Sequence, residues 1–596
     1  MIRLRTGSHS LTGSQSHRRR AAYATVSLCD HETPEALLKR TVALLTALAL
    51  SLPTAAQRKN QEPEQPRLVE NIDVRVINVD VIVTDRRGNY IPNLTADDFI
   101  ILENNVQKPI SNFYEVQGTV TKNPLGDVPA PQAVTPDGRK AVPEHMKRRI
   151  IFYVDNLSLA PFNRNKVFAE MKKFVVETMR PGDEAMIATY NRSMKVRMPF
   201  TPDTKALIAT LDGLARETGM GIANRSERKQ AEERIRDASS YQDALSTARN
   251  YAASIEHDLR QSAASINALM TTLAGVEGKK VLVLTSEGFP MQPGRELFTY
   301  IDEMGREKGW QNVGSTMLEG MTYDGTNIVQ SIAKTANANG ITMYTVHAAG
   351  LAMTNEMSAE NSRPTPIAVS HAAMTNTTES MHLMADMTGG VASVQTNNFA
   401  AAFDRIRTDL DSYYSLGYRA GTERVDRQRY LTVRMKNKDY RARTRQTFVE
   451  KSMYAEMNDR VVANLLYRGK ENQLGILARV RTPLPTEDGL FRVPVDVQIP
   501  MQALTLLPQG ETDYIGGFDV YVVVANKDND MSEVARKSHQ VRVPAADYKN
   551  LSGKFYTYTL DMLMEKGLNK VSIGVVDQIS NTSGFAREQI IAADTR

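Results

Sequence analysis

The chain has 596 residues, a hydrophobic fraction of 41%, a charged fraction of 24% and a formal net charge of +5. These values are typical of globular proteins, and the length allows about three or four domains. The charges form no long block of one sign, so we expect no nucleic-acid partner.

Residues 1–56 are predicted to be an export leader. A Lys-Arg pair precedes the uncharged run at 42–52, and small residues follow at 53–56, in the order of a secretory signal and its cleavage site. The run is shorter than the ~20 residues that span a bilayer, and no later segment is long and apolar enough, so we expect no integral membrane segment after leader removal. A buried N-terminal helix is the alternative. The single cysteine, Cys29, lies in the leader, so we expect neither disulfides nor a thiolate metal site in a secreted, periplasmic or cell-surface protein.

A tether and a small β module are predicted to follow. Residues 57–66 are polar and contain two prolines, which is typical of a tether. Within residues 67–118, valines alternate with mainly polar residues over 74–84, and two shorter strand-like runs follow. Residues 119–147 are rich in Pro, Gly, Asp and Ala and lack periodicity, so we expect a linker.

Residues 148–420 alternate between strand-like and helix-like patterns, which predicts a mainly parallel sheet with helices on both faces. The expected strands are at 150–154, 184–190, 195–199, 280–284, 341–346 and 391–393. The first is an apolar run that ends at Asp155, and open α/β sheets bind their ligands at this end of the strands. Residues 225–274 are predicted to be a long helical insertion. Its mixed charges favour a solvated face, with a partner-binding arm as the alternative.

Two further β regions are expected after the α/β domain. Residues 421–450 are predicted to form a hairpin of strands at 430–435 and 440–448. We expect this hairpin to complete the N-terminal β module, so that the α/β domain is inserted into it. Residues 451–596 are predicted to be a β-sandwich with a leading helix, because short strands separated by turn signals follow one helical pattern.

Six strings occur in one order over residues ~75–450: "VIVTDRRGNYIPNLTADDFIILENN", "IIFYVDNLSL", "VLVLTSEGF", "IAKTANANGITMYTVHAAG", "LMADMTGGVASVQTNNFAAAFDRI" and "LDSYYSLGYRA". Together they resemble the secreted acidobacterial VWFA-related family, whose members contain a von Willebrand factor type A domain. The resemblance implies a multidomain fold: an α/β Rossmann-like type A domain with flanking β-sandwich domains. It also implies a metal-ion-dependent adhesion site, whose Mg²⁺ takes hard oxygen ligands and accepts a carboxylate from a partner.

The family's first metal-binding loop is Asp-x-Ser-x-Ser, and this chain departs from it. Asp155 matches, whereas Leu157 and Leu159 stand at the two serine positions, and neither can bind a metal. Ser158 is one place out of register. The alternative is that Asp155 caps the turn that follows and that both leucines pack beneath the loop.

The other two loops of the family's site supply a threonine and an aspartate. Thr218 is the best candidate for the threonine, and Glu287, which follows Ser286, stands where the aspartate is expected. The resemblance therefore implies a degenerate site of Asp155, Ser158, Thr218 and Glu287 for Mg²⁺ or Ca²⁺.

These observations favour a secreted, non-enzymatic protein of the adhesion type that binds a protein partner. A structural subunit of an extracellular or cell-envelope assembly is the alternative. A hydrolase with Asp155 and Glu287 as general acid and base is disfavoured, because the sequence supplies neither a nucleophile nor a settled metal site.

Overall fold

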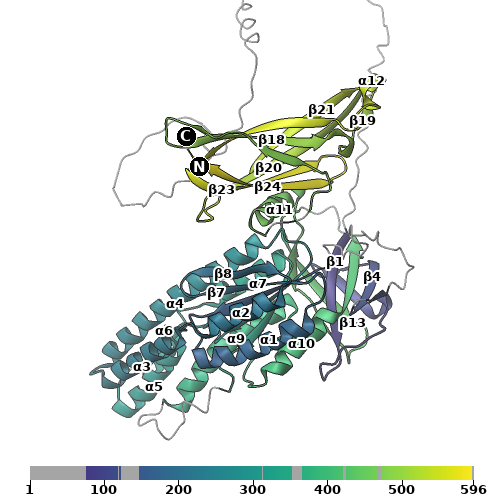
Figure 1. The fold of residues 1–596 in the computed structure, drawn as a ribbon. Coiled ribbons are helices and arrows are strands. Elements are labelled where there is room, and N and C mark those ends of the chain that lie inside the picture. Colours follow the sequence, from purple (N-terminus) through teal and green to yellow (C-terminus); the bar gives the residue numbers. More distant parts are fainter. Residues whose placement is uncertain are drawn as a thin grey trace, which may run out of the picture.

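The computed structural model describes residues 76–118, 120–122, 147–311, 313–351, 365–419, 425–467, 469 and 471–593. The predicted leader at 1–56 and tether at 57–66 lie outside the described residues, as does most of the predicted linker at 119–147. The described residues form an α/β unit, a β unit beside it and a C-terminal unit of two sheets (Figure 1). Among them, no helix is long and apolar enough to cross a membrane.

The α/β unit contains a six-stranded sheet in the order β11-β10-β9-β6-β7-β8. Its strands are β6 (Arg148–Asp155), β7 (Glu184–Tyr190), β8 (Met194–Thr201), β9 (Lys279–Ser286), β10 (Ile341–His347) and β11 (Ala392–Ser393). Neighbouring strands are parallel, except that β8 is antiparallel to β7. The last residues of β6, β9 and β10, which are Asp155, Ser286 and His347, therefore lie along one edge of the sheet, here called the carboxyl edge.

Helices cover both faces of this sheet because successive side chains along β6 point to opposite faces. Ile150, Phe152 and Val154 pack in one core with α1, α2 and α10, whereas Ile151 and Tyr153 pack in a second core with α4, α7 and α9. The bounds of these helices are α1 (Pro161–Thr178), α2 (Thr204–Ala215), α4 (Tyr241–Thr272), α7 (Thr326–Ala338), α9 (Ile367–Thr388) and α10 (Phe399–Asp411). Burial on both sides accounts for the continuous apolar run of β6.

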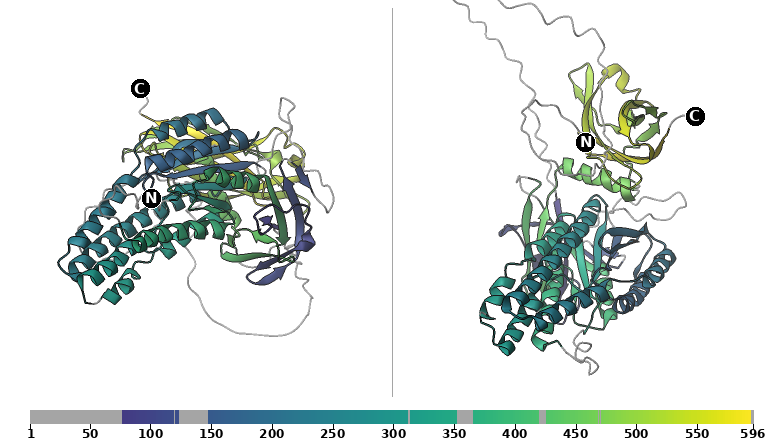
Figure 2. Two further views of the ribbon diagram at one scale, coloured as in Figure 1. Left: turned by 90° about the horizontal axis from the view of Figure 1, so that it is seen from below. Right: turned by 90° about the vertical axis from the view of Figure 1, so that its left-hand side faces the viewer.

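The helical insertion predicted at 225–274 is two helices rather than one. They are α3 (Gly221–Asp237) and α4, and the break falls at 238–240, where Ser240 accepts a hydrogen bond from the backbone of Asp243 as the N-cap of α4. The first half of α4 packs with α3 and α5 (Arg295–Lys308) around a separate apolar core. Together with α6 (Thr316–Gly320), these helices extend on the side of the sheet opposite the β unit (Figures 1 and 2).

Strands from before and after the α/β unit make up the β unit. One sheet has the order β14-β1-β12-β4-β5 and the other β15-β13-β2-β3. Their bounds are β1 (Val76–Thr84), β2 (Phe99–Glu103), β3 (Val106–Lys108), β4 (Ile110–Gln117), β5 (Val120–Lys122), β12 (Ser412–Arg419), β13 (Gln428–Met435), β14 (Arg441–Arg443) and β15 (Thr447–Val449). Because β12 pairs with β1 and β4, and β13 pairs with β2, the chain leaves this unit, forms the α/β unit and returns.

Two details of the return differ from the sequence-based expectation. Strand β12 belongs to the β unit, so the chain leaves the α/β unit at Asp411 rather than at 420. The predicted strand at 440–448 is split into β14, which pairs with β1, and β15, which pairs with β13. The split arises because the two sheets face each other across one core, and the chain must cross from one to the other between the two pieces.

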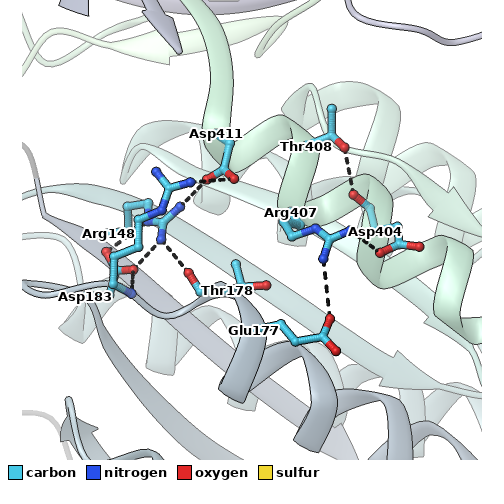
Figure 3. Close-up of polar contacts among 9 residues, drawn as sticks. Arg148, Glu177, Thr178, Asp183, Asp404, Arg407, Thr408 and Asp411 are labelled. Atoms are coloured by element: carbon cyan, nitrogen blue, oxygen red, sulfur yellow. Dashed lines mark hydrogen bonds and ion pairs between the residues drawn. The ribbon is translucent and has the colours of Figure 1, made fainter. Parts of the chain in front are cut away.

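Arg148 and Asp411 mark where the chain enters and leaves the α/β unit, and an ionic cluster joins them (Figure 3). The Arg148 guanidinium donates through Nε to Asp183 at 2.9 Å, through Nη1 to Asp411 at 2.7 Å and through Nη2 to the carbonyl oxygen of Thr178 at 2.8 Å. Arg180 adds a second ion pair to Asp411 at 2.7 Å. The cluster fixes the two crossing points to each other and to the loop before β7.

The C-terminal unit has two sheets that share one apolar core. The first contains β16 (Leu477–Val480), β17 (Leu484–Pro485), β18 (Phe491–Pro500) and β22 (Phe555–Met564), and the second contains β19 (Leu507–Gln509), β20 (Asp513–Ala525), β21 (Ala535–Pro544), β23 (Gly567–Asp577) and β24 (Ser583–Ala592). Helix α11 (Met453–Tyr467) packs on the outside of the second sheet and lies between this unit and the others (Figure 2). Tyr467 on α11 shares a 2.7 Å hydrogen bond with Thr272 on α4, which ties the unit to the α/β unit.

Candidate functional site

Asp155, Ser158 and Ser286 form a closed hydrogen-bonded cluster at the carboxyl edge. The hydroxyl groups of Ser158 and Ser286 donate to the same oxygen of Asp155, Oδ2, at 2.7 and 2.8 Å. The two hydroxyl oxygens lie 3.1 Å apart. Asp155 is almost fully buried, at 2% exposure. Its carboxylate is therefore held by the protein's own donors beneath the surface of the edge.

The loop after β6 is shaped by its two leucines. Leu157 packs in the core on the α4 face of the sheet, and Leu159 packs in the core on the α1 face. The Asp155 carbonyl oxygen accepts from the backbone N–H groups of Ser158 and Leu159, each at 3.2 Å, and its side-chain Oδ1 accepts from the Ser158 N–H at 3.4 Å. Both leucines are therefore buried, and the Asp155 side chain contacts the turn that follows it.

Glu287 lies at the surface of the same edge and is connected to Asp155 through Ser158, whose Oγ accepts from the Glu287 backbone N–H at 3.0 Å. The Glu287 carboxylate accepts from the backbone N–H of Ala160 and from the side chain of Asn163, each at 3.2 Å. Ala160 is the N-cap of α1, so Glu287 sits at the positive end of that helix. These donors fix the carboxylate in place.

Arg225, on the second turn of α3, is a further side chain that contacts the Glu287 carboxylate. Its Nη2 lies 3.0 Å from Oε1 and 2.8 Å from Oε2 of Glu287. The Glu287 side chain is only 15% exposed, whereas the Arg225 side chain is 45% exposed. The half-exposed Arg225 side chain thus pairs with a carboxylate that is mostly shielded from solvent.

Thr218 is not brought into this cluster. It is exposed on the loop between α2 and α3, and in the part of the chain that the structure describes no hydrogen bond links it to Asp155 or Glu287. The same loop is nevertheless fixed against the turn after β6, because the backbone N–H of Met220 donates to the Asn156 carbonyl oxygen at 3.0 Å. A side chain at Gly221 would lie 2.3 Å from the Ser158 carbonyl oxygen, so this close approach requires glycine.

Arg164 is a positioning residue that sequence reasoning missed. It is fully buried on α1 and donates to the Asn156 side chain at 3.1 Å and to the Glu217 carbonyl oxygen at 2.7 Å. It therefore joins the loop after β6 to the loop before α3. The sequence did contain a signal for this role. Arg164 has the helical spacing of the apolar residues Val167, Phe168 and Met171, which places it on the buried face of the helix. An arginine is seldom buried unless it has hydrogen-bonding partners, so partners could have been expected.

Burial shifts the pKa values of two ionisable groups at the carboxyl edge, Asp155 and His347. Burial raises the pKa of Asp155, and the hydrogen bonds from Ser158 and Ser286 offset part of that increase. Burial also lowers the pKa of His347, against the opposing effect of the Glu287 charge and together with that of Arg225, which favours the neutral imidazole. His347 Nδ1 is buried and has no hydrogen-bond partner among the described residues.

These residues do not fit a hydroxyl-rich metal site. The two positions where hydroxyl ligands are expected hold buried leucines, one oxygen of Asp155 is taken by two serine hydroxyls, and Glu287 is paired with Arg225. A metal beside Glu287 would have to displace or repel a guanidinium. Among the described residues, no group of three or more His, Cys, Asp or Glu side chains is arranged to hold a metal ion.

No protein-family model and no curated protein matches the chain. Among solved structures, an aerotolerance-related membrane protein from Bacteroides fragilis is similar at 11% identity and a TM-score of 0.24, covering 44% of this chain and 98% of that one. BatB from Bacteroides thetaiotaomicron is similar at 10% identity and a TM-score of 0.21, covering 44% and 97%. A mussel byssus protein, proximal thread matrix protein 1 with a zinc-occupied metal-ion-dependent adhesion site, is similar at 13% identity and a TM-score of 0.19, covering 48% and 50%. At these TM-scores the similarities identify neither a family nor a function.

Proposed function

We propose that this chain is an exported, non-enzymatic protein that binds another protein through the carboxyl edge of its α/β unit, without a bound metal ion. The observation that carries this proposal is the pairing of Glu287 with Arg225. A half-exposed arginine side chain is paired with a fixed carboxylate at the edge where open α/β sheets bind ligands. The edge is therefore preorganised and charged, which suits recognition.

The fold supports a von Willebrand factor type A-like reading of the α/β unit. A central strand ends in an acid, helices cover both faces and a single antiparallel strand closes one side of the sheet. In this reading Asp155, Ser158 and Glu287 are the remains of a degenerate metal-ion-dependent adhesion site, and residues 471–593 are a β-sandwich. The leader pattern at 1–56 supports export to the periplasm, the cell surface or the medium.

Site-specific photo-crosslinking in the source organism tests the proposal. A photoreactive amino acid is placed at Ile222, which is 60% exposed one turn before Arg225 on α3, and at Val106, which is also 60% exposed but lies on β3 in the β unit. We expect a covalent adduct with another protein from position 222 and none from position 106. The adduct should persist in EDTA, because the proposed contact needs no metal.

The comparison of the two positions separates the proposal from its alternatives. Equal adducts from both positions would indicate a subunit packed into an assembly over much of its surface, which contradicts a contact specific to the carboxyl edge. The absence of an adduct from position 222 would contradict the proposal outright. Loss of the adduct in EDTA would contradict its metal-independent form.

A further inference from the structure

Strand β22 forms one edge of the first sheet of the C-terminal unit, because among the described residues it pairs with β18 alone. It keeps one unbroken register with β18 from Phe555 to Met564. Asp561 is its only charged residue, and it contains neither proline nor glycine. An exposed edge of this kind is a template for pairing with another strand, and proteins usually protect such edges with charges, prolines or bulges.

The other edge strands of this unit carry that protection or are short. β21 contains Arg536, Lys537 and Arg542, and β24 contains Arg587 and Glu588. β16, β17 and β19 have four, two and three residues. Within the part of the unit that the structure describes, β22 is therefore the one long edge that nothing in its own sequence protects.

Hydrogen bonds around β18 show which backbone groups of β22 face away from the sheet. The Pro494 carbonyl oxygen of β18 accepts from Arg481, which follows β16, at 2.9 Å, and the Lys554 carbonyl oxygen accepts from Met501 at 2.9 Å. Because backbone groups alternate in direction along a strand, the even-numbered residues of β22 bond to β18 and the odd-numbered residues point outward. The outward-facing residues are Phe555, Thr557, Thr559, Asp561 and Leu563. Their backbone groups have no partner among the described residues.

The polar side chains on the outer face of β22 already have partners within the first sheet. Thr559 donates to Asp496 at 2.7 Å, and Asp561 accepts from Arg492 at 2.7 Å. Near the start of the strand, the Phe555 side chain is 47% exposed. The edge therefore presents a row of unpaired backbone groups and an exposed aromatic side chain, and its one charge is balanced.

We propose that β22 pairs antiparallel with β22 of a second copy of this chain, around a two-fold axis at Thr559. In this register Thr557 of each copy lies opposite Asp561 of the other, and Phe555 lies opposite Leu563. The outward-facing residues of the two strands then exchange their N–H···O bonds, apolar side chains meet at both ends, and no like charges are opposed. An axis at Asp561 would instead place two carboxylates directly opposite each other.

The inner face of the strand is complementary to itself in the same register. The half-buried Tyr556 and Tyr558 pack at the margin of the core that contains Leu560 and Met562. With the axis at Thr559, Tyr556 lies opposite Met562 of the second copy and Tyr558 lies opposite Leu560. The apolar core would thus continue from one copy into the other. This interface lies in a different unit from the carboxyl edge and does not depend on the function proposed above.

Sedimentation velocity of the full chain over a range of concentrations tests this inference. We expect a reversible dimer with a dissociation constant on the order of 10 μM, because pairing at one strand edge is smaller than a standard interface. Thr557→Pro removes an outward-facing N–H, which an edge strand tolerates, and should raise the dissociation constant at least about tenfold. Circular dichroism and the melting temperature check that the variant is folded.

Gln540→Pro is the matched control on β21, the other edge strand on this side of the unit. The Ala545 N–H donates to the Thr512 carbonyl oxygen, so the odd-numbered residues of β21 bond to β20 and Gln540 faces outward. The substitution therefore removes the same kind of backbone donor from a strand of equal length. It should leave the dissociation constant unchanged.

Cysteine crosslinking tests the register and does not depend on the proline variant. In a Cys29→Ser background, Thr559→Cys places two thiols at the axis, where paired Cα atoms lie about 5.5 Å apart, within reach of a disulfide. We expect mild oxidation to yield a covalent dimer from Thr559→Cys. Thr557→Cys and Gln540→Cys should yield none, because their counterparts in the second copy are several residues away along the strand or on another strand.

Three results would overturn the inference. The first is a chain that remains monomeric at concentrations far above the expected dissociation constant. The second is a dimer that folded Thr557→Pro leaves intact, or that Gln540→Pro weakens equally. The third is a covalent dimer that forms as readily from Thr557→Cys or Gln540→Cys as from Thr559→Cys.

Discussion

Replacing Leu159 with serine, the residue that an adhesion-site loop would carry there, is expected to lower the free energy of unfolding by about 3–5 kcal/mol. Leu159 is 0% exposed and packs with Phe168 of α1 and Leu211 of α2. The substitution removes three carbon atoms from a packed core and places a hydroxyl there without an evident partner. Urea denaturation followed by circular dichroism measures the change.

Leu159→Met is the matched control, because it conserves volume and apolarity and should cost less than about 1.5 kcal/mol. A serine variant as stable as the wild-type chain would contradict the packing role assigned to this loop. It would indicate that the loop can rearrange to expose position 159, as a metal-binding loop would need to do.

Replacing Arg148 with methionine is expected to lower the free energy of unfolding by about 3–5 kcal/mol as well. The substitution leaves the buried Asp183 carboxylate without its guanidinium partner and removes one of the two ion pairs of Asp411 (Figure 3). Because Arg148 and Asp411 stand where the chain crosses between units, the loss should also weaken the attachment of the α/β unit to the β unit. Urea denaturation gives the free energy, and limited proteolysis near 147 reports the local opening.

Arg86→Met is the control for this variant. Arg86 pairs with Asp439 at 2.7 Å in the β unit, but both side chains are about 70% exposed. An exposed pair of this kind contributes no more than about 1 kcal/mol. If Arg148→Met and Arg86→Met had similarly small effects, the buried cluster would not be a structural clamp.

The helices and strands of the α/β unit were predictable because the spacing of apolar residues along the sequence indicates which side chains are buried. An apolar run of β-branched and aromatic residues such as Ile150–Val154 has few alternatives to a buried strand, and the helical spacing of Val167, Phe168 and Met171 identifies α1. The acid that ends β6 could therefore be placed at the carboxyl edge from sequence. Its proximity to Glu287 followed from the parallel order of β6 and β9.

The chemistry of the site was less accessible, because it depends on contacts between distant residues. Arg225 reaches Glu287 across 62 positions, and the sequence marks α3 only as part of a charged helical stretch. The helix break at 238–240 was hidden because serine is tolerated within helices and favoured at N-caps alike. Likewise, the strand pattern of β12 cannot indicate which of two sheets it joins.

The pairing of Glu287 with Arg225 also affects how Leu157 and Leu159, which stand at the two serine positions of an Asp-x-Ser-x-Ser loop, are interpreted. Taken alone, two leucines in place of two serines indicate a weakened metal site. In the structure both leucines are buried and Glu287 is paired with Arg225, so the contact proposed at this edge needs no metal ion.

The melting temperature of the full chain during titration with Mg²⁺, Ca²⁺ and Mn²⁺ tests the metal-free carboxyl edge most directly. A ligand present at 100 times its dissociation constant stabilises a folded protein by about 2.7 kcal/mol, which is readily seen as a shift of the melting temperature. We predict no saturable shift with any of the three ions, in the wild-type chain or in Asp155→Ala. A saturable shift in the wild-type chain that Asp155→Ala abolishes would contradict the proposal that this edge acts without a bound metal ion.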